Sequence, residues 1–462
     1  FLRYTAAGGT ELWSTDGTPA GTVLEETEGG LTVARELTSL SATELLFVAS
    51  EPATGSELYT LPDGGGGATL VIDLATESPT HSSQPSFLTT VANEHLLFLA
   101  AGKDADQGIH RYSPTSGHER LVSMSPTNWQ HDPDFCTAFL GGALVTLFGI
   151  PEPDPNQGLW RTDGTAAGTQ QLTPSWSATY WEDGTLFHAP SERAYFSGVT
   201  AGSGWELWRT DGTPGGTGLL VDLAPGGDSI PMNLTAFGPH FVFSADDGIH
   251  GREVWISDGT AAGTQLLADI HPTGDSDPVG FLEVGDLVYF TADDGNHGRE
   301  PWVTDGTAAG TNPLGDLRPG TGGSMASSYG SSGTPFHAIG DRVVFSAGAN
   351  LDGGWIHVSD GTPSGTIPLV TFESSWHSGN PSQFVQYGGQ TYFVLKDTTG
   401  AWALYTSDLR PAGTVWVTDL PQESWSHYPP SAEPVVVDHG FFLALDMLVF
   451  SDGTQAGTVA LP

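Results

Sequence analysis

The stretch that decides the fold reads Glu253-Val-Trp255-Ile-Ser-Asp258-Gly-Thr260-Ala-Ala-Gly263-Thr264. Its pattern, (E/W)-x-(W/Y)-x-(S/T)-D-G-T-x-x-G-T, recurs along the whole chain of 462 residues. The clearest aspartates lie 44 to 55 residues apart, at Asp163, Asp211, Asp258, Asp305, Asp360, Asp408 and Asp452. A period of this length indicates a solenoid, a propeller or an array. One small unit is therefore copied about ten times, and the motif itself is expected to have a structural role.

Three further copies extend the series, one at Asp16 and two altered ones near Pro62 and Thr115. Neighbouring repeats share one continuous core, so a single large domain over residues 1–462 is expected rather than several ordinary ones. The approximate repeat units are 1–30, 31–78, 79–127, 128–176, 177–225, 226–272, 273–319, 320–373, 374–421 and 422–462.

Each unit contains four short apolar or alternating segments separated by turn residues, which is typical of antiparallel strands. In one unit these segments are 281–284, 287–292, 299–304 and 312–316. Four antiparallel strands in about 47 residues make a propeller blade. The predicted fold is all-β, a single large β-propeller of four-stranded antiparallel blades with about ten repeats. The first unit shows only its last three strands, giving 39 strands in all; one strand lies upstream of Phe1, or one blade is short.

An aromatic residue recurs in the third strand of most units. We expect it to fill the gap between neighbouring blades. Every unit has to pack on its neighbour, so a residue that recurs from unit to unit is expected to serve that packing. These residues are Trp13, Tyr59, Trp160, Trp208, Trp255, Trp302 and Tyr405.

The charge balance restricts the kinds of partner that the chain can bind. Asp and Glu number 54 against 14 Lys and Arg, a formal net charge of −40. Such a chain repels phosphate backbones and anionic lipid surfaces, so we expect no nucleic-acid binding. No apolar run is long enough to insert into a membrane. A solvated exterior and a surface that binds divalent cations both remain open. The single cysteine, Cys136, cannot form an internal disulfide.

The repeat resembles the bacterial ELWxxDGT-type repeat family, which is sometimes labelled hyalin-like. Glu11-Leu-Trp13-Ser-Thr-Asp16-Gly-Thr18 matches that motif closely. The resemblance implies a secreted or cell-surface protein, and the absence of a signal peptide before Phe1 is what a processed, mature form would show. The Ser/Thr-Asp-Gly-Thr turn is also similar to the Asp-box hairpin of sialidase-like propellers, where it is structural.

The connections between units are the predicted binding surface. Because strands alternate in direction, the fourth-to-first connections and the second-to-third turns emerge on one face. Most repeat positions are alike, so the connections that differ are the best indication of function. Four connections carry Trp, and three of those also carry His: Trp129 with His131, Trp176 with Trp181, Trp376 with His377, and Trp425 with His427 and Tyr428.

Exposed aromatic side chains with polar neighbours stack on sugar rings or anchor a protein partner. We therefore expect these connections to bind a glycan or an extracellular protein. Two other interpretations stay open. Each Trp could cap its own blade, or His131, His377 and His427 could form a transition-metal site.

The second-to-third turns offer candidate calcium ligands in the pairs Asp246/Asp247 and Asp293/Asp294. Their spacing matches no EF-hand loop, and an Asp-stabilised turn is the alternative. His250 and His297 occupy equivalent repeat positions and are expected to pack against the next blade. The cofactor is unknown from the sequence, and calcium is a candidate.

The sequence does not favour an enzyme, because it lacks a Gly-x-Ser-x-Gly, a His-Glu-x-x-His and a phosphate loop. Paired carboxylates such as Asp132 and Asp134 are expected by chance among so many acids. The favoured function is a binding module on the loop face. The alternatives are a polysaccharide-active or metal-dependent enzyme that uses the same face, and a structural subunit of an extracellular assembly.

Overall fold

The computed structural model describes most of the chain, and the following paragraphs concern those residues alone. They are residues 2–4, 10–14, 23–24, 33–41, 44–51, 55–62, 68–74, 83–91, 95–100, 108–123, 135–147, 158–173, 187–189, 193–200, 202–325, 335–348, 355–371, 382–396, 401–420, 434–444 and 448–460.

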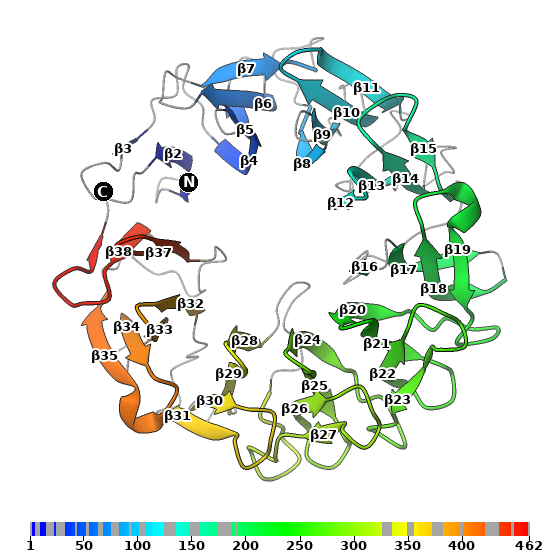
Figure 1. Cartoon of the computed structure of the whole chain (residues 1–462). Coiled ribbons are helices and arrows are strands. Elements are labelled where there is room, and N and C mark those ends of the chain that lie inside the picture. Colours follow the sequence, from blue (N-terminus) through cyan, green and yellow to red (C-terminus); the bar gives the residue numbers. More distant parts are fainter. Residues whose placement is uncertain are drawn as a thin grey trace. The chain divides into compact units, whose positions relative to one another are not determined.

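The described residues contain 39 strands and two short 3₁₀ helices, with no α-helix. The strands form one three-stranded sheet and nine four-stranded antiparallel sheets, as the sequence predicted (Figure 1). In each sheet the strands lie side by side in chain order. No helix in these residues is long and apolar enough to cross a membrane.

By its contacts the chain divides into two compact units. Unit 1 comprises residues 1–15, 23–181 and 190–220, and unit 2 comprises residues 16–22, 182–189 and 221–462. Each is described by itself below, and closure of all the sheets into one propeller stays a prediction.

Unit 1 begins with the three-stranded sheet and continues with three complete sheets and most of a fourth. Its strands are β1 (Leu2–Tyr4), β2 (Thr10–Ser14), β3 (Val23–Leu24), β4 (Val33–Ser41), β5 (Glu44–Glu51), β6 (Gly55–Pro62), β7 (Thr69–Ile72), β8 (Ser86–Val91), β9 (His95–Ala100), β10 (Gly108–Ser113), β11 (Gly117–Ser123), β12 (Phe135–Phe139), β13 (Gly142–Leu147), β14 (Gly158–Thr162), β15 (Gln170–Gln171), β17 (Arg193–Thr200), β18 (Gly204–Thr210) and β19 (Gly218–Val221), with the 3₁₀ helix η1 (Pro214–Gly216) before β19.

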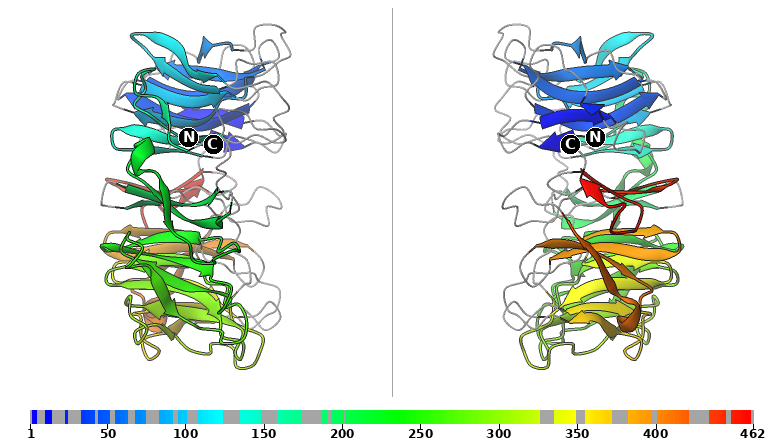
Figure 2. Two further views of the ribbon diagram at one scale, coloured as in Figure 1. Left: turned by 90° about the vertical axis from the view of Figure 1, so that its right-hand side faces the viewer. Right: turned by 90° about the vertical axis from the view of Figure 1, so that its left-hand side faces the viewer.

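Unit 2 holds five complete sheets, whose strands Figure 2 shows from the side. Its strands are β16 (Phe187–Ala189), β20 (Met232–Phe237), β21 (His240–Asp246), β22 (Arg252–Ser257), β23 (Gln265–Ala268), β24 (Val279–Val284), β25 (Leu287–Asp293), β26 (Arg299–Thr304), β27 (Asn312–Pro313), β28 (Phe336–Ile339), β29 (Arg342–Ala347), β30 (Trp355–Ser359), β31 (Ile367–Thr371), β32 (Ser382–Tyr387), β33 (Gln390–Lys396), β34 (Trp402–Ser407), β35 (Val415–Asp419), β36 (Val435–Val437), β37 (Gly440–Ala444), β38 (Leu448–Ser451) and β39 (Val459–Ala460), with the 3₁₀ helix η2 (Pro411–Gly413) before β35.

The core of each unit lies between successive sheets. In unit 2, Val242 and Ile256 of the β20–β23 sheet form one buried cluster with Phe281, Phe290 and Trp302 of the β24–β27 sheet. Alternate residues of a strand point to opposite faces, so each sheet presents one apolar face to the sheet before it and one to the sheet after it. Burial of these faces is what stacks the repeats.

The recurring aromatic residue of the third strand is buried or partly buried in the described sheets, and Trp302 lies between two sheets, as predicted. Tyr59, Trp208, Trp255 and Trp302 are buried. Trp160 and Tyr405 are partly buried against clusters that join two sheets. The side chain of Trp13 lies outside the described residues.

Two sheets have histidine where most of the others have Trp or Tyr. His110 lies opposite Phe98 in the sheet register and His357 lies opposite Phe345, just as Trp255 lies opposite Phe243. Both imidazoles stack on the phenylalanine that they face. The repeat pattern had missed these two residues, because histidine breaks the Trp/Tyr signature while keeping a flat ring.

Candidate functional site

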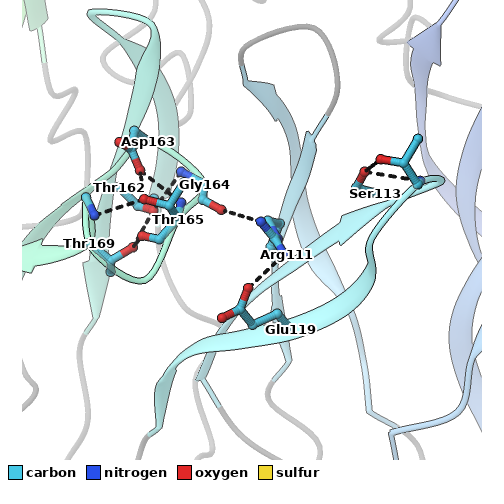
Figure 3. A network of polar contacts seen from close by, with 10 residues as sticks. Arg111, Ser113, Glu119, Thr162, Asp163, Gly164, Thr165 and Thr169 are labelled. Carbon is cyan, nitrogen blue, oxygen red and sulfur yellow. Dashed lines mark hydrogen bonds and ion pairs between the residues drawn. The ribbon is translucent and has the colours of Figure 1, made fainter.

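The Asp-Gly-Thr turn between the third and fourth strands is a closed hydrogen-bond network (Figure 3). Oδ1 of Asp163 accepts hydrogen bonds from the amide of Thr165 at 2.9 Å and from its hydroxyl at 2.7 Å. The Thr165 hydroxyl oxygen in turn accepts from the amide of Gly168. The same two bonds to the carboxylate recur at Asp211, Asp258, Asp305, Asp360 and Asp452.

The second glycine of the motif is required by close approach. A Cβ built on Gly263 would lie 2.1 Å from Oδ1 of Asp258, and the equivalent glycines are equally crowded. The side-chain hydrogen bond from Thr260 lowers the pKa of Asp258, and the corresponding threonine acts likewise on Asp305. The recurring residues of this turn therefore stabilise the turn itself, which is the structural role predicted from the repeat.

In unit 1 a neighbouring sheet contacts one of these turns. Arg111 of β10 donates a hydrogen bond to the carbonyl oxygen of Gly164 at 3.2 Å and forms an ion pair with Glu119 of β11 at 2.7 Å (Figure 3). The arginine therefore links the β8–β11 sheet to the Asp163 turn of the β12–β15 sheet.

The second-to-third turns hold the predicted calcium ligands. Oδ1 of Asp247 accepts hydrogen bonds from the amides of Ile249 and His250, and its Oδ2 lies 2.8 Å from Nδ1 of His250. Asp246 accepts from the amide of Gly248. Asp293, Asp294 and His297 repeat this arrangement one unit later.

The aspartates of these turns already accept hydrogen bonds within the turn. Partial burial would raise the pKa of Asp247, but its hydrogen bonds with His250 and Ile249 outweigh burial and lower it. Within the described part of the chain no group of three or more His, Cys, Asp or Glu side chains could hold a metal ion. Calcium binding at Asp246, Asp247, Asp293 and Asp294 stays a prediction.

The expectation that His250 and His297 pack against the next sheet is wrong. Their side chains are 38% and 52% exposed. Each ring instead pairs with the aspartate three residues earlier, and its hydrogen bond to that aspartate raises the pKa of the imidazole. Local pairing within the turn satisfies the ring nitrogen that packing would have left buried.

A buried glutamate two residues before the third-strand aromatic fixes the next connection. Glu253 is fully buried, and its carboxylate accepts hydrogen bonds from the amides of Ile270, His271 and Ser276 and from the Ser276 hydroxyl, at 2.6 to 3.2 Å. The three residues that donate belong to the fourth-to-first connection. We call this arrangement the glutamate latch.

The latch recurs in two more sheets. Glu57 accepts from the amides of Leu74 and Ser83 and from the Ser83 hydroxyl. Glu300 accepts from Leu317 and Ser324 in the same manner. Burial raises the pKa of Glu57 and of Glu300 to about 7, against the lowering effect of these hydrogen bonds. Burial also raises the pKa of Glu253.

The latched connections meet the second-to-third turns at the same end of the sheets. Oδ1 of Asp275 accepts from the amide of Arg252 at 2.8 Å, and a Cβ on Gly251 would lie 2.6 Å from that same oxygen. A Cβ on Gly295 would lie 2.5 Å from Nε2 of His271. The connection over residues 269–278 therefore contacts the turn before it and the turn after it. In this part of unit 2, turns and connections form one continuous surface, the loop face.

The connections fall into two groups, according to whether the third strand before them has this glutamate. The units with glutamate at the latch position are those of Glu11, Glu57, Glu206, Glu253 and Glu300, and none of their following connections contains Trp. The equivalent residues of the remaining units that precede a connection are Gly108, Gly158, Trp355 and Ala403. The connections after these four are the ones that carry Trp129, Trp176, Trp181, Trp376 and Trp425.

The predicted ligand-binding side chains are all in connections outside the described residues. These are Trp129, His131, Trp176, Trp181, Trp376, His377, Trp425, His427 and Tyr428. The structure describes the strands on both sides of these connections. The third strands before these connections have no glutamate at the latch position.

No protein-family model and no curated relative matches the chain. Among solved structures it is similar to a prolyl endopeptidase, with a TM-score of 0.37, 11% identity and coverage of 90% of this chain and 54% of that one. It is also similar to a puromycin hydrolase (TM-score 0.34, 14% identity, 83% and 61% covered) and to a puromycin-hydrolyzing peptidase of Mycobacterium tuberculosis (TM-score 0.34, 13% identity, 83% and 60% covered). The chain spans less than two thirds of the length of each of these proteins.

Proposed function

We propose that this chain is a secreted or cell-surface acidic β-propeller that binds a glycan or an extracellular protein through its loop face. In this proposal the sheets are the blades of one ring. The side chains that contact the ligand come from the Trp-bearing connections, with Trp129, Trp376 and Trp425 as the main aromatic surfaces.

The observation that carries the proposal is the division of the connections. At Glu57, Glu253 and Glu300 the latch glutamate ties the connection to the third strand by hydrogen bonds. Where the glutamate is replaced, the connection contains Trp, and in three of four cases His as well. Loss of a buried structural group together with gain of aromatic side chains is typical of a loop that serves recognition.

The rest of the repeat supports this assignment by elimination. The Asp258-type turn and the Trp302-type core residues are occupied with structural contacts in the described sheets. The net charge of −40 disfavours nucleic acid and anionic membranes as ligands. The ELWxxDGT-type resemblance supports an extracellular location.

A glycan array with and without chelator tests the proposal. The wild-type chain should bind a defined set of glycans, and a variant with Trp129→Ala, Trp376→Ala and Trp425→Ala should lose that binding while its thermal midpoint stays nearly unchanged. Loss of stability with unchanged binding would show that the tryptophans cap their own sheets.

The same protein samples test whether binding depends on a metal ion. Binding that disappears with chelator and returns with calcium supports calcium at the Asp246/Asp247 and Asp293/Asp294 turns. One equivalent of a transition metal in purified protein, lost on replacement of His131, His377 and His427, would instead support the metal-dependent enzyme. If no glycan binds, affinity capture with the wild type and the triple variant side by side tests a protein ligand.

A further inference from the structure

One exposed tryptophan lies on a described strand and not in one of the Trp-bearing connections. Trp416 is the second residue of β35, the outer strand of the β32–β35 sheet (Figure 1). Its side chain is 46% exposed, and Val415 beside it is 51% exposed. The indole Nε1–H donates a hydrogen bond to Oδ1 of Asp419 at 3.0 Å. An exposed indole is therefore held in one orientation by a carboxylate three residues away.

Other sheets have smaller side chains at the register position of Trp416. The position opposite the third-strand aromatic holds Leu70 in the β4–β7 sheet, Gln171 in the β12–β15 sheet, Leu266 in the β20–β23 sheet and Pro313 in the β24–β27 sheet. In the β32–β35 sheet it holds Trp416 opposite Tyr405.

An aliphatic side chain is enough to cover the outer end of the aromatic row, as Leu70 does while staying 40% exposed. Trp416 has a larger side chain than leucine, and 46% of it is exposed. A large exposed aromatic surface beside a polar group is a feature of binding sites.

We propose that Trp416 and Asp419 form a binding subsite for a pyranose ring of an uncharged or amine-bearing polysaccharide. The apolar C–H face of a pyranose stacks on a flat indole, and a hydroxyl or ammonium group on the ring donates to the carboxylate. The hydrogen bond from Trp416 to Asp419 fixes both groups before the ligand arrives, which reduces the entropy lost on binding.

The charge of the chain selects among ligands that could stack on an indole. Nucleobases and acidic sugars arrive on polyanions, which a net charge of −40 repels. Neutral sugars are not repelled, and an amino sugar is attracted by the carboxylate and by the indole face. The subsite does not depend on the proposed loop face, because it uses β35 alone.

Binding of soluble hexamers by calorimetry and by saturation-transfer NMR tests the subsite. The probes are cellohexaose, the β-1,4-linked glucosamine hexamer and an oligogalacturonate. They are neutral, cationic and anionic chains of pyranoses. Measurements are made on the wild-type chain and on the triple variant of Trp129, Trp376 and Trp425. A difference between those two proteins reports on the loop face, and binding that remains in the triple variant reports on the β35 subsite.

In the triple variant we expect Trp416→Ala to weaken binding of cellohexaose, of the glucosamine hexamer or of both by about tenfold. Trp416→Phe should give an intermediate loss because it keeps a flat ring without the N–H donor. Leu70→Ala, at the same register position of another sheet, should leave affinity unchanged. Salt-sensitive preference for the glucosamine hexamer would identify the amine-bearing ligand.

Three results would overturn this proposal. They are unchanged affinity in Trp416→Ala, equal losses in Trp416→Ala and Leu70→Ala, and no binding of either non-anionic hexamer to the triple variant. Preferential binding of the oligogalacturonate would also contradict it.

Discussion

The connection after β23 and the connection after β35 join equivalent strands in two sheets of unit 2, yet the sequence treats them differently. The first is fixed by four hydrogen bonds to the buried Glu253. The second belongs to a sheet whose third strand, β34, has Ala403 in place of the glutamate, and it carries Trp425, His427 and Tyr428. In the proposed function, the first type of connection is structural and the second type serves recognition. Changes in each type of connection should therefore have opposite consequences.

The largest effect is expected from the tryptophan of the core. Trp302 is buried between two sheets, so Trp302→Ala should lower the free energy of unfolding by about 3–5 kcal/mol. Trp376→Ala, in a Trp-bearing connection, is the matched control and should cost less than about 1 kcal/mol. Urea denaturation measures both. Equal losses would remove the distinction between scaffold and connection tryptophans.

Removal of the latch should come next. Glu253→Ala removes the acceptor of the Ile270 and His271 amides, and it leaves the amide and hydroxyl of Ser276 only the carbonyl oxygen of Arg252, so we expect a loss of about 3 kcal/mol. Glu119→Ala removes a partly exposed carboxylate that pairs with Arg111, and it should cost less than about 1 kcal/mol. A loss at Glu253 no greater than that at Glu119 would contradict the latch. Hydrogen exchange of the Ile270 amide gives a local measurement of the same bond.

A smaller loss is expected in the repeated turn. Gly263→Ala places a Cβ against the Asp258 carboxylate and should destabilise the protein by about 1–2 kcal/mol. Gly215→Ala lies in the equivalent segment of another unit, where a Cβ meets nothing within 4 Å, and should have little effect. If thermal melts of the two variants coincide, the close approach is not what requires glycine.

The last prediction concerns pH. Burial raises the pKa of Glu57 and Glu300 from 4.5 to about 7, so the folded chain holds these protons more tightly than the unfolded chain. Their contribution to stability is complete below the unfolded pKa and is lost as pH rises through the folded value. Stability should therefore fall between roughly pH 5 and pH 8. Replacement of both residues by Gln should flatten that slope, and an unchanged slope would exclude them as its source.

The sequence predicted the sheets and the core well, because both depend on residues that every unit repeats. Trp255 and Asp258 could be assigned from spacing and turn chemistry alone. The latch could not, since Glu253 lies 17 to 23 residues from the groups that it binds and nothing local indicates the contact. The side-chain pairing of His250 was missed for a related reason, because the spacing does not show whether a ring turns inward or back to its own aspartate.

The candidate binding residues were found by departure from the repeat, which is a signal of position and composition only. That signal identified the connections of Trp129, Trp376 and Trp425 without giving a geometry for their side chains. The latch adds the physical reason why those connections differ, since each follows a third strand whose glutamate has been replaced.

The most direct test compares two triple variants for glycan binding and thermal stability in parallel. One replaces Trp129, Trp376 and Trp425 by Ala, and the other replaces Glu57, Glu253 and Glu300 by Gln. We expect the first to lose binding and keep its thermal midpoint, and the second to keep binding at low temperature and melt earlier. The opposite pattern, with binding lost from the glutamate variant and stability lost from the tryptophan variant, would contradict the assignment of recognition to the Trp-bearing connections.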